Sequence, residues 1–327
     1  MGVQAMGMQR EQVEQIEQIE LDGDTVIEFS AMASVCKIRL AGVDAGTARA
    51  WAEQAIAEVR RIETTYSRYR GDSIVSRINA AAGRGKAVAL DAETADLLGF
   101  ADQLWRASDG LFDITSGVLR RAWDFRRQRL PSQAELDVLL PLIGWGEVAW
   151  SREAIALPRP GMQLDFGGFG KEYAADRAAG LLQALGARSG IVNLGGDLRV
   201  LGPRPDGSPW RIAIAHPREP GGVIASLPVS QGALATSGDY ERSMVLDGRR
   251  YCHLLHPRHG WPVSHWQAIS VLAPACLAAG ALTTIAMLKE ADAPAFLREQ
   301  GVSWLAVDAQ GGVTRVDPLV GVVDPSQ

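Results

Sequence analysis

The sequence predicts an α+β fold made of mixed, mainly antiparallel sheets with packed helices. Short apolar or alternating runs lie between Gly, Pro and Asp turns, and longer runs have helical spacing. The two kinds follow each other without a regular βαβ rhythm, which favours α+β over a doubly wound sheet. The 327-residue chain shows no internal repeat and no Pro/Ser-rich linker. We therefore expect one compact, two-lobed unit.

The first part of the chain predicts a strand pair followed by helices. Residues 24–40 alternate between apolar and polar side chains, as paired strands do. Residues 46–67 carry apolar side chains at helical spacing. Two further helices are expected over 91–108 and 132–141, and Pro131 and Ser132 form an entry signal for the second.

The centre of the chain is predicted to be rich in strands. The expected strands are 152–157, 162–166, 190–193, 197–201, 210–216 and 223–229. Asp247-Gly248 between two apolar runs indicates a hairpin.

Strands and helices are also expected towards the C-terminus. The charge-free run over 267–288 is long enough to be considered as a membrane span. Pro274 and Gly280 interrupt it, so we interpret it as a strand (267–273) and a helix (275–289). A helix at 292–300 and strands at 303–307 and 313–316 complete the expected elements.

The two ends are expected to lie outside a single domain over residues 23–320. Residues 1–22 have only three regularly spaced apolar side chains, which favours a tail slightly over a short amphipathic helix. Residues 321–327 are expected to be a C-terminal tail. The start lacks a basic segment followed by an apolar one, so we expect no secretory signal and a cytoplasmic location.

The composition is that of an ordinary globular protein, with 47% hydrophobic and 22% charged residues. A net charge of -5 and the lack of a long basic block argue against nucleic-acid binding. The three cysteines, Cys36, Cys252 and Cys276, are odd in number and widely spaced. A disulfide framework or a structural zinc site is therefore not expected.

The stretch LDFGGFGKEYAAD places Gly167, Gly168 and Gly170 between an apolar run and an expected helix. Free backbone N–H groups and the helix dipole at such a turn suit an anion. The spacing matches neither common phosphate-binding glycine pattern, so a turn that needs glycine for steric reasons remains the alternative.

Two later segments also suit a phosphate or a flat ligand. Gly195 and Gly196 in IVNLGGDLRV leave bare backbone for close approach, although a β-bulge is the better explanation of this segment taken alone. Thr236, Ser237 and Gly238 offer hydroxyl and N–H groups, and Arg242 can add a charge-assisted contact. A capped turn is the alternative for this second segment.

His253, His256 and His259 follow each other at intervals of three. The spacing suggests a metal cluster, but a strand that ends at Pro257 should turn the rings to different sides. A single histidine acting as a general base is the better hypothesis, because imidazole titrates near neutral pH. Asp113 and Thr115 in DGLFDITSG lie in a Gly-bounded loop that is not diagnostic by itself.

Seven segments, in this order, resemble the ApbE family of FAD:protein FMN transferases from about Met32 to Leu288. They are TYSRYRGDSIVSRIN, GLFDITSG, DFGGFGKEYAADRAA, VNLGGDLRV, LATSGDYER, RYCHLLHPRHGWPV and VLAPACLAAGALTTIAML. The resemblance implies an ApbE-like, T-fold-related fold. It also implies Mg²⁺-dependent cleavage of FAD, transfer of FMN to a Thr or Ser hydroxyl of an acceptor flavoprotein, and release of AMP. Relatives are often exported and membrane-anchored.

The resemblance assigns roles to individual positions. His253 is the implied catalytic base, and Gly170, through its carbonyl, and Thr284 are implied metal ligands. The implied cofactor-binding residues are Met32, Tyr69, Asp113, Thr115, Gly167, Gly168, Gly170, Tyr173, Asp176, Asn193, Gly195, Gly196, Thr236, Ser237, Gly238 and Arg242.

The chain departs from the family pattern where an acidic metal ligand is expected. The family has an Asp four residues before the metal-binding Thr, and this chain has Gly280 there. One interpretation is an active transferase in which Asp165, Asp239 or Glu172 replaces that carboxylate. The alternative is an FAD-binding relative with weak or no transferase activity. If the missing carboxylate is the defect, Gly280→Asp should raise activity.

Overall fold

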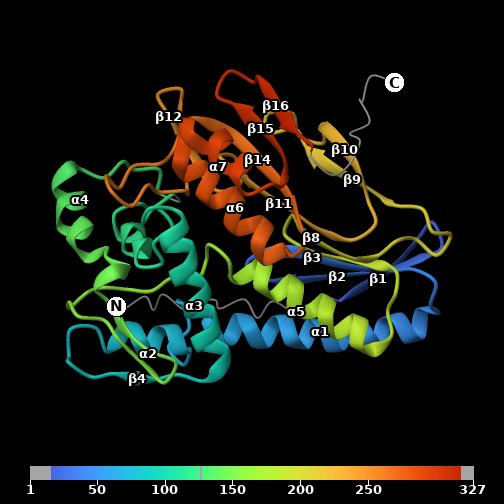
Figure 1. Ribbon diagram of the computed structural model, residues 1–327, viewed down its shortest axis with the longest axis horizontal. Helices are drawn as coiled ribbons and strands as arrows, with labels where there is room; N and C mark the ends of the chain where they lie inside the picture. The colour runs from blue at the N-terminus through green and yellow to red at the C-terminus, as the bar shows by residue number, and fades with distance from the viewer. Residues whose placement is uncertain (1–15, 126, 318–327) are drawn as a thin grey trace, which may run out of the picture.

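The structure is a computed structural model that describes residues 16–125 and 127–317. Its centre is a nine-stranded sheet with the order β1-β2-β3-β7-β8-β11-β14-β15-β16 (Figure 1). Every neighbouring pair in it is antiparallel, which confirms the α+β class. The strands are β1 Glu17–Leu21, β2 Asp24–Ala31, β3 Ser34–Leu40, β7 Gly190–Leu194, β8 Asp197–Gly202, β11 Gly232–Gly238, β14 Trp266–Ala273, β15 Ser303–Asp308 and β16 Val313–Val316.

Three long helices cover one face of this sheet (Figure 1). They are α1 Ala45–Tyr66, α5 Gly170–Leu185 and α6 Cys276–Lys289. Side chains alternate along β11, so Ala233 and Ala235 pack in the core under the helices and Leu234 packs in the core on the other face. Because neighbouring side chains point to opposite faces, β11 directs the hydroxyl of Ser237 towards α6.

The opposite face of the sheet is covered by the ribbon of β9 Trp210–Ala215 and β10 Val223–Val229. The remaining elements lie around one end of the sheet and the cavity described below. They are α2 Ile74–Ala80, β4 Val88–Ala89, α3 Ala92–Ala107, η1 Ser116–Arg121, α4 Gln133–Leu139, η2 Leu140–Leu142, η3 Trp145–Glu147, β5 Ala149–Trp150, β6 Ala154–Ala156, β12 Ser243–Leu246, β13 Arg249–Cys252, η4 Glu290–Asp292 and α7 Ala293–Glu299. β12 and β13 form the expected hairpin.

Two expectations differ from the described structure. Residues 17–21, within the expected tail or short helix, form β1, because β2 offers them an edge to pair with. The strand expected at 162–166 is wrong, because the backbone N–H and C=O of Leu164 both bond to the side chain of Asn79 instead of a neighbouring strand. The expected C-terminal tail, 321–327, lies outside the described residues.

Helix α2, which the sequence analysis did not predict, begins after Ser73. The Ser73 side chain accepts a hydrogen bond from the backbone N–H of Ser76, as an N-cap residue does. No helix in the described part of the chain is long and apolar enough to cross a membrane.

Candidate active site

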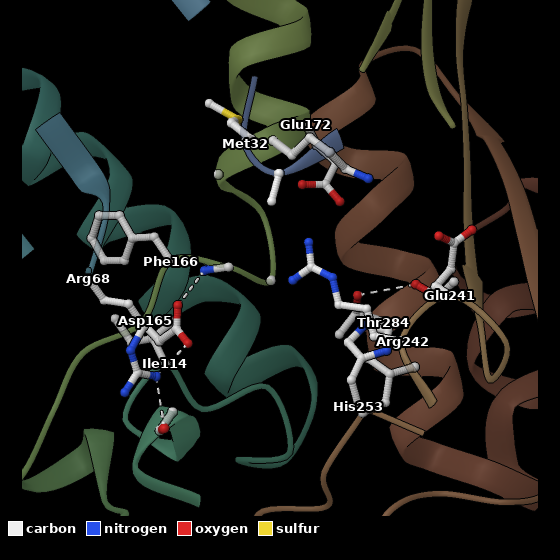
Figure 2. A pocket seen from close by; sticks show the side chains of 18 of the residues that line it. Met32, Arg68, Ile114, Asp165, Phe166, Glu172, Glu241, Arg242, His253 and Thr284 are labelled. Atoms are coloured by element: carbon white, nitrogen blue, oxygen red, sulfur yellow. Dashed lines mark hydrogen bonds and ion pairs between the residues drawn. The ribbon is translucent and has the colours of Figure 1, made fainter. Parts of the chain in front are cut away.

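A cavity of about 520 Å³ opens at the end of the sheet where the segments singled out in the sequence meet. Its wall includes the turn between β2 and β3, the turn before α5, the ends of β11 and α6, and residues after β13. In Figure 2, Met32 and Glu172 point into the cavity from one side, and Arg242 and His253 from the other. The predicted residues that line it are Met32, Tyr69, Asp113, Gly167, Gly168, Gly170, Gly195, Thr236, Ser237, Gly238, Arg242, His253 and Thr284.

The glycine-rich turn is held in place by Asp165. Its carboxylate accepts hydrogen bonds from the backbone N–H of Gly167 at 2.8 Å and from Arg68 at 2.8 Å. Arg120 lies 3.5 Å from the same carboxylate. Burial acts to raise the pKa of Asp165, but Arg68 and Arg120 hold it below its usual value. Asp165 is therefore an ionised anchor for the turn, and its charge is already compensated.

Helix α5 begins at Gly170 directly after this turn, and no side chain caps its first turn. An uncapped N-terminus presents N–H groups and the positive end of the helix dipole. Arg68, Arg120 and Arg242, which we call the basic region, also line the cavity. Three guanidinium groups and the one Asp165 carboxylate leave a charge of +2 among these four groups, which suits a phosphate group.

His253 lies in the cavity near the basic region. Burial, followed by the charges of Arg120 and Arg242, lowers the pKa of His253 to about 4. The Nδ1 atom of His253 is buried and has no hydrogen-bond partner. The imidazole is therefore neutral at pH 7.

Glu172 and Asp197, with the intervening Lys171, form what we call the acidic region. Lys171 Nζ lies 2.7 Å from Asp197 and donates to the carbonyl of Gly195 at 3.2 Å. Glu172 is 8% exposed and Asp197 3%. Burial and then the charge of Asp197 raise the pKa of Glu172 to about 8, while Lys171 opposes the shift. The Oε2 atom of Glu172 is buried without a hydrogen-bond partner.

Gly280 lies directly against Glu172. A Cβ atom built on Gly280 would lie 2.5 Å from Cγ and 2.8 Å from Oε1 of Glu172. The Glu172 side chain therefore occupies the space into which an aspartate at position 280 would extend. This contact changes the expectation for Gly280→Asp, because the added side chain would collide with a carboxylate already present.

Asp176, one turn after Glu172 on α5, fixes the position of α6 relative to α5. The carboxylate of Asp176 accepts hydrogen bonds from the backbone N–H groups of Cys276 at 2.9 Å and Leu277 at 2.8 Å. Asp176 thus caps α6 from a neighbouring helix, as an N-cap residue does. This cap holds Gly280 against Glu172.

Hydroxyl groups line the side of the cavity formed by β11 and α6. Ser237 Oγ lies 2.9 Å from Thr283 Oγ1 and 3.4 Å from Thr284 Oγ1. Thr236 points to the opposite face of β11, where its hydroxyl bonds to Ser270 at 2.8 Å. Ser237 and Thr284 therefore present side-chain oxygens here, whereas the Thr236 hydroxyl already has a partner away from the cavity.

Met32 and Tyr69 lie at the other side of the cavity. Met32 is in the turn of the β2–β3 hairpin with a φ of 51°, an uncommon conformation for a residue other than glycine. Its backbone N–H donates to Glu63 at 2.8 Å, which holds it there. Tyr69 is 81% exposed, and Arg68 lies over its ring. The other face of the Tyr69 ring is available to a planar ligand ring.

Five predicted residues do not line the cavity, and their binding roles stay predictions. Asp113 accepts from the Thr115 hydroxyl and from the backbone N–H of Trp145, so Thr115 supports the loop that contains Asp113. The other four are Tyr173, which donates to Glu93; Asp176, which caps α6; Asn193, which accepts from Gly196; and Gly196 itself. They hold the elements around the cavity.

The rings of His256 and His259 are not turned to different sides, as the sequence had suggested. They stack with centroids 4.1 Å apart and an interplanar angle of 4°. Their Nδ1 atoms accept backbone N–H groups of Arg258 and Trp261, because the chain turns tightly after Pro257. No three His, Cys, Asp or Glu side chains within residues 16–125 and 127–317 form a group that could hold a metal ion.

The sequence and the fold are similar to those of known proteins. The ApbE family model matches residues 32–306 of the chain. The chain belongs to the ApbE family. It is 26% identical to the FAD:protein FMN transferase of Escherichia coli over 298 residues, which are 88% of this chain and 85% of the relative.

Solved ApbE structures extend the comparison to the fold. The crystal structure of the ApbE protein from Thermotoga maritima aligns with a TM-score of 0.82 and 28% identity, over 93% of this chain and 97% of that one. The flavinyl transferase ApbE of Pseudomonas stutzeri aligns with a TM-score of 0.78 and 30% identity, over 92% of this chain and 97% of that one. These ApbE structures agree with the mainly antiparallel sheet and packed helices seen here.

Several charged residues of this ApbE site were not singled out from the sequence. They are Arg68, Arg120, Lys171 and Asp197. Arg68, Lys171 and Asp197 lie inside segments that were quoted for the resemblance. Lys171 and Asp197 directly follow the glycine turns, which was a usable signal. Arg120 carried no such signal, because the packing of η1 brings it to Asp165.

Proposed function

We propose that this protein transfers FMN from FAD to a Ser or Thr hydroxyl of an acceptor protein and releases AMP. The observation that carries the proposal is the meeting, in one cavity, of a basic region, an uncapped helix N-terminus, paired hydroxyls and a neutral histidine. Phosphoryl transfer needs these groups, because the phosphate oxygens must be held and the attacking hydroxyl must lose a proton. Membership of the ApbE family supports the same chemistry.

The residues of this chain hold the pyrophosphate of FAD in the proposed reaction. The basic region and the N–H groups at the start of α5 attract its oxygens. Ser237 and Thr284 add hydroxyl groups from the other side of the cavity. The exposed face of Tyr69 and the side chain of Met32 are placed to contact a planar ring.

The transfer step forms one bond and breaks one. The acceptor hydroxyl oxygen attacks the phosphorus of the FMN half, and the bond from that phosphorus to the bridging oxygen breaks, so that AMP leaves. His253 takes the hydroxyl proton. A pKa of about 4 makes the free imidazole a weak base. Bound phosphate is negatively charged and raises the pKa of a neighbouring histidine.

The residues present also fit a magnesium ion. Thr284 and Gly170, whose carbonyl the resemblance implies as a ligand, line the cavity, and Glu172 presents a buried carboxylate oxygen without a partner. Oxygen ligands of this kind are those that magnesium prefers. When bound, such an ion neutralises phosphate charge.

Mass spectrometry tests the proposal. The protein is incubated with FAD, MgCl₂ and an acceptor domain of the flavinylated type, and a second sample contains the acceptor with its target hydroxyl residue changed to Ala. We expect the mass of one FMN on the first acceptor only, together with released AMP. A verified acceptor that stays unmodified while the protein binds FAD would contradict transfer.

That result would favour a second candidate, an FAD-binding protein with little or no transferase activity. The observation behind it is Gly280, where the family pattern has an acidic metal ligand. An FAD-dependent rise in melting temperature without any acceptor adduct would support it.

A further inference from the structure

Where α5 packs on α6, the carboxylate of Glu172 lies next to position 280, the position at which the family pattern has an aspartate and this chain has glycine. Only glycine at position 280 leaves room for Glu172 in the conformation seen here, because a Cβ at this position would lie 2.5 Å from Cγ of Glu172. The Glu172 side chain comes from α5 and points into the cavity (Figure 2). Its Cγ and carboxylate lie next to Gly280. The two positions are therefore complementary: one lacks a side chain so that the other can fill its place.

One oxygen of the Glu172 carboxylate is not satisfied by the protein around it. Its Oε2 atom is buried and has no hydrogen-bond partner. The neighbouring Lys171 is engaged by Asp197 and by the carbonyl of Gly195. Two carboxylates and one ammonium group leave a charge of -1 in this buried region when all three are ionised. A buried charge without a partner is costly, so the site favours a cation.

Residues with neutral oxygen atoms line the same cavity. Thr284 is one turn along α6 from Gly280, so the two residues share a face of the helix. Ser237 Oγ lies 3.4 Å from Thr284 Oγ1, and Gly170, whose carbonyl is an oxygen donor, precedes Glu172 by two positions. A hard divalent cation binds such a set of carboxylate, hydroxyl and carbonyl oxygens.

We propose that Glu172 supplies the carboxylate ligand of a divalent cation in this site, in the place of a residue at position 280. The inference deepens the proposed function and rests on it, because the cation would bind next to the FAD pyrophosphate. In this arrangement, the acidic ligand comes from α5 and not from α6, and glycine at position 280 gives it the room it needs. The absence of an acidic residue at position 280 is then explained by a different set of metal ligands.

The test is a titration of the whole protein, loaded with FAD, with MnCl₂. Bound Mn²⁺ is measured by electron paramagnetic resonance, which needs no turnover. Glu172→Gln keeps the shape and removes the charge, and we expect at least about a tenfold loss of Mn²⁺ affinity from it. The matched control is Glu241→Gln, an exposed carboxylate that lines the same cavity, which should change the affinity less than about twofold.

A double variant that exchanges the residues at positions 172 and 280 tests whether the loss of affinity comes from the missing carboxylate or from a disturbed site. Glu172→Gly combined with Gly280→Asp returns a carboxylate to α6 and removes the collision. We expect this double variant to recover Mn²⁺ affinity to within about tenfold of the unchanged protein. Unchanged affinity in Glu172→Gln, an equal loss in Glu241→Gln, or no Mn²⁺ binding by the unchanged protein would each overturn the inference.

The outcomes separate this inference from the proposed function. Mn²⁺ binding that depends on Glu172, without any FMN transfer to a verified acceptor, would keep the inference and remove the function. FMN transfer with Mn²⁺ binding that ignores Glu172 would do the reverse.

Discussion

The basic and acidic regions lie in one cavity, and a buried carboxylate behaves differently in each. Asp165, which adjoins the basic region, is paired with Arg68 and Arg120, which hold its pKa below the usual value in spite of burial. Glu172 in the second is buried beside Asp197, and burial and that neighbour raise its pKa to about 8. Both carboxylates are buried, so the difference comes from their neighbours. The charge of Asp165 is compensated by two arginines, whereas we propose that the charge of Glu172 is compensated by a bound cation.

The largest expected effect is on the rate of FMN transfer when His253, the proposed base, is replaced. His253→Gln should lower the rate of FMN transfer about 10²- to 10⁴-fold, because it removes the proton acceptor. FAD affinity should stay nearly unchanged, and a fluorescence titration checks this. A large loss of FAD affinity would make His253 a binding residue instead.

The same histidine predicts a pH dependence of stability. The pKa of His253 is about 4 in the folded protein against 6.5 for an unperturbed imidazole. The unfolded chain therefore binds a proton first as the pH falls, and the free energy of unfolding should decrease between pH 6.5 and 4. Urea unfolding at several pH values measures it, and His253→Gln should be flatter over this range. Equal slopes would contradict the lowered pKa.

Removing the charge of Asp165 should destabilise the fold. Asp165→Asn leaves Arg68, whose side chain is 12% exposed, without its charged partner, and we expect a loss of about 3 kcal/mol in the free energy of unfolding. Urea unfolding measures it. The matched control is Asp72→Asn, because Asp72 pairs with Arg70 in the solvent and should matter little. Similar losses in both variants would mean that the pair in the basic region is not special.

Filling the space beside Glu172 should also destabilise the fold. Gly280→Asp forces a side chain against Cγ of Glu172, which we expect to cost about 1–3 kcal/mol. Gly180→Asp is the control, because a Cβ at Gly180, an exposed position in α5, meets nothing within 4 Å. Adding Glu172→Gly to Gly280→Asp should restore most of the loss. A fully stable Gly280→Asp variant would show that Glu172 moves aside freely.

The smallest effect on stability is expected at Glu172. Glu172→Gln, measured without divalent cations at pH 9, where the carboxylate is ionised, should leave the free energy of unfolding unchanged or raise it by about 1 kcal/mol, because a buried charge without a partner is removed. Asp165→Asn and Glu172→Gln each replace a buried carboxylate by an amide, one before and one after the Gly167–Gly170 turn. A loss in both would contradict the difference between the two regions.

The sequence predicted much of this arrangement, and the rest depended on packing. Short alternating runs and the helix at 275–289 followed from periodicity, and the glycine turns marked the cavity because glycines stand where other groups approach closely. The strand expected at 162–166 failed because Asn79, far away in the chain, bonds to the backbone of Leu164. The contact of Glu172 with Gly280 had no local signal, since it exists only when Asp176 fixes α6 on α5.

The most direct measurement is the position of a bound metal. Crystals of the protein with FAD and MnCl₂, measured near the manganese absorption edge, locate the ion by its anomalous signal. We predict a single peak between Glu172 and Thr284, with the Glu172 carboxylate oxygen about 2.1 Å from the ion. A peak with Glu172 turned away from it, or no peak in this cavity, would contradict the account.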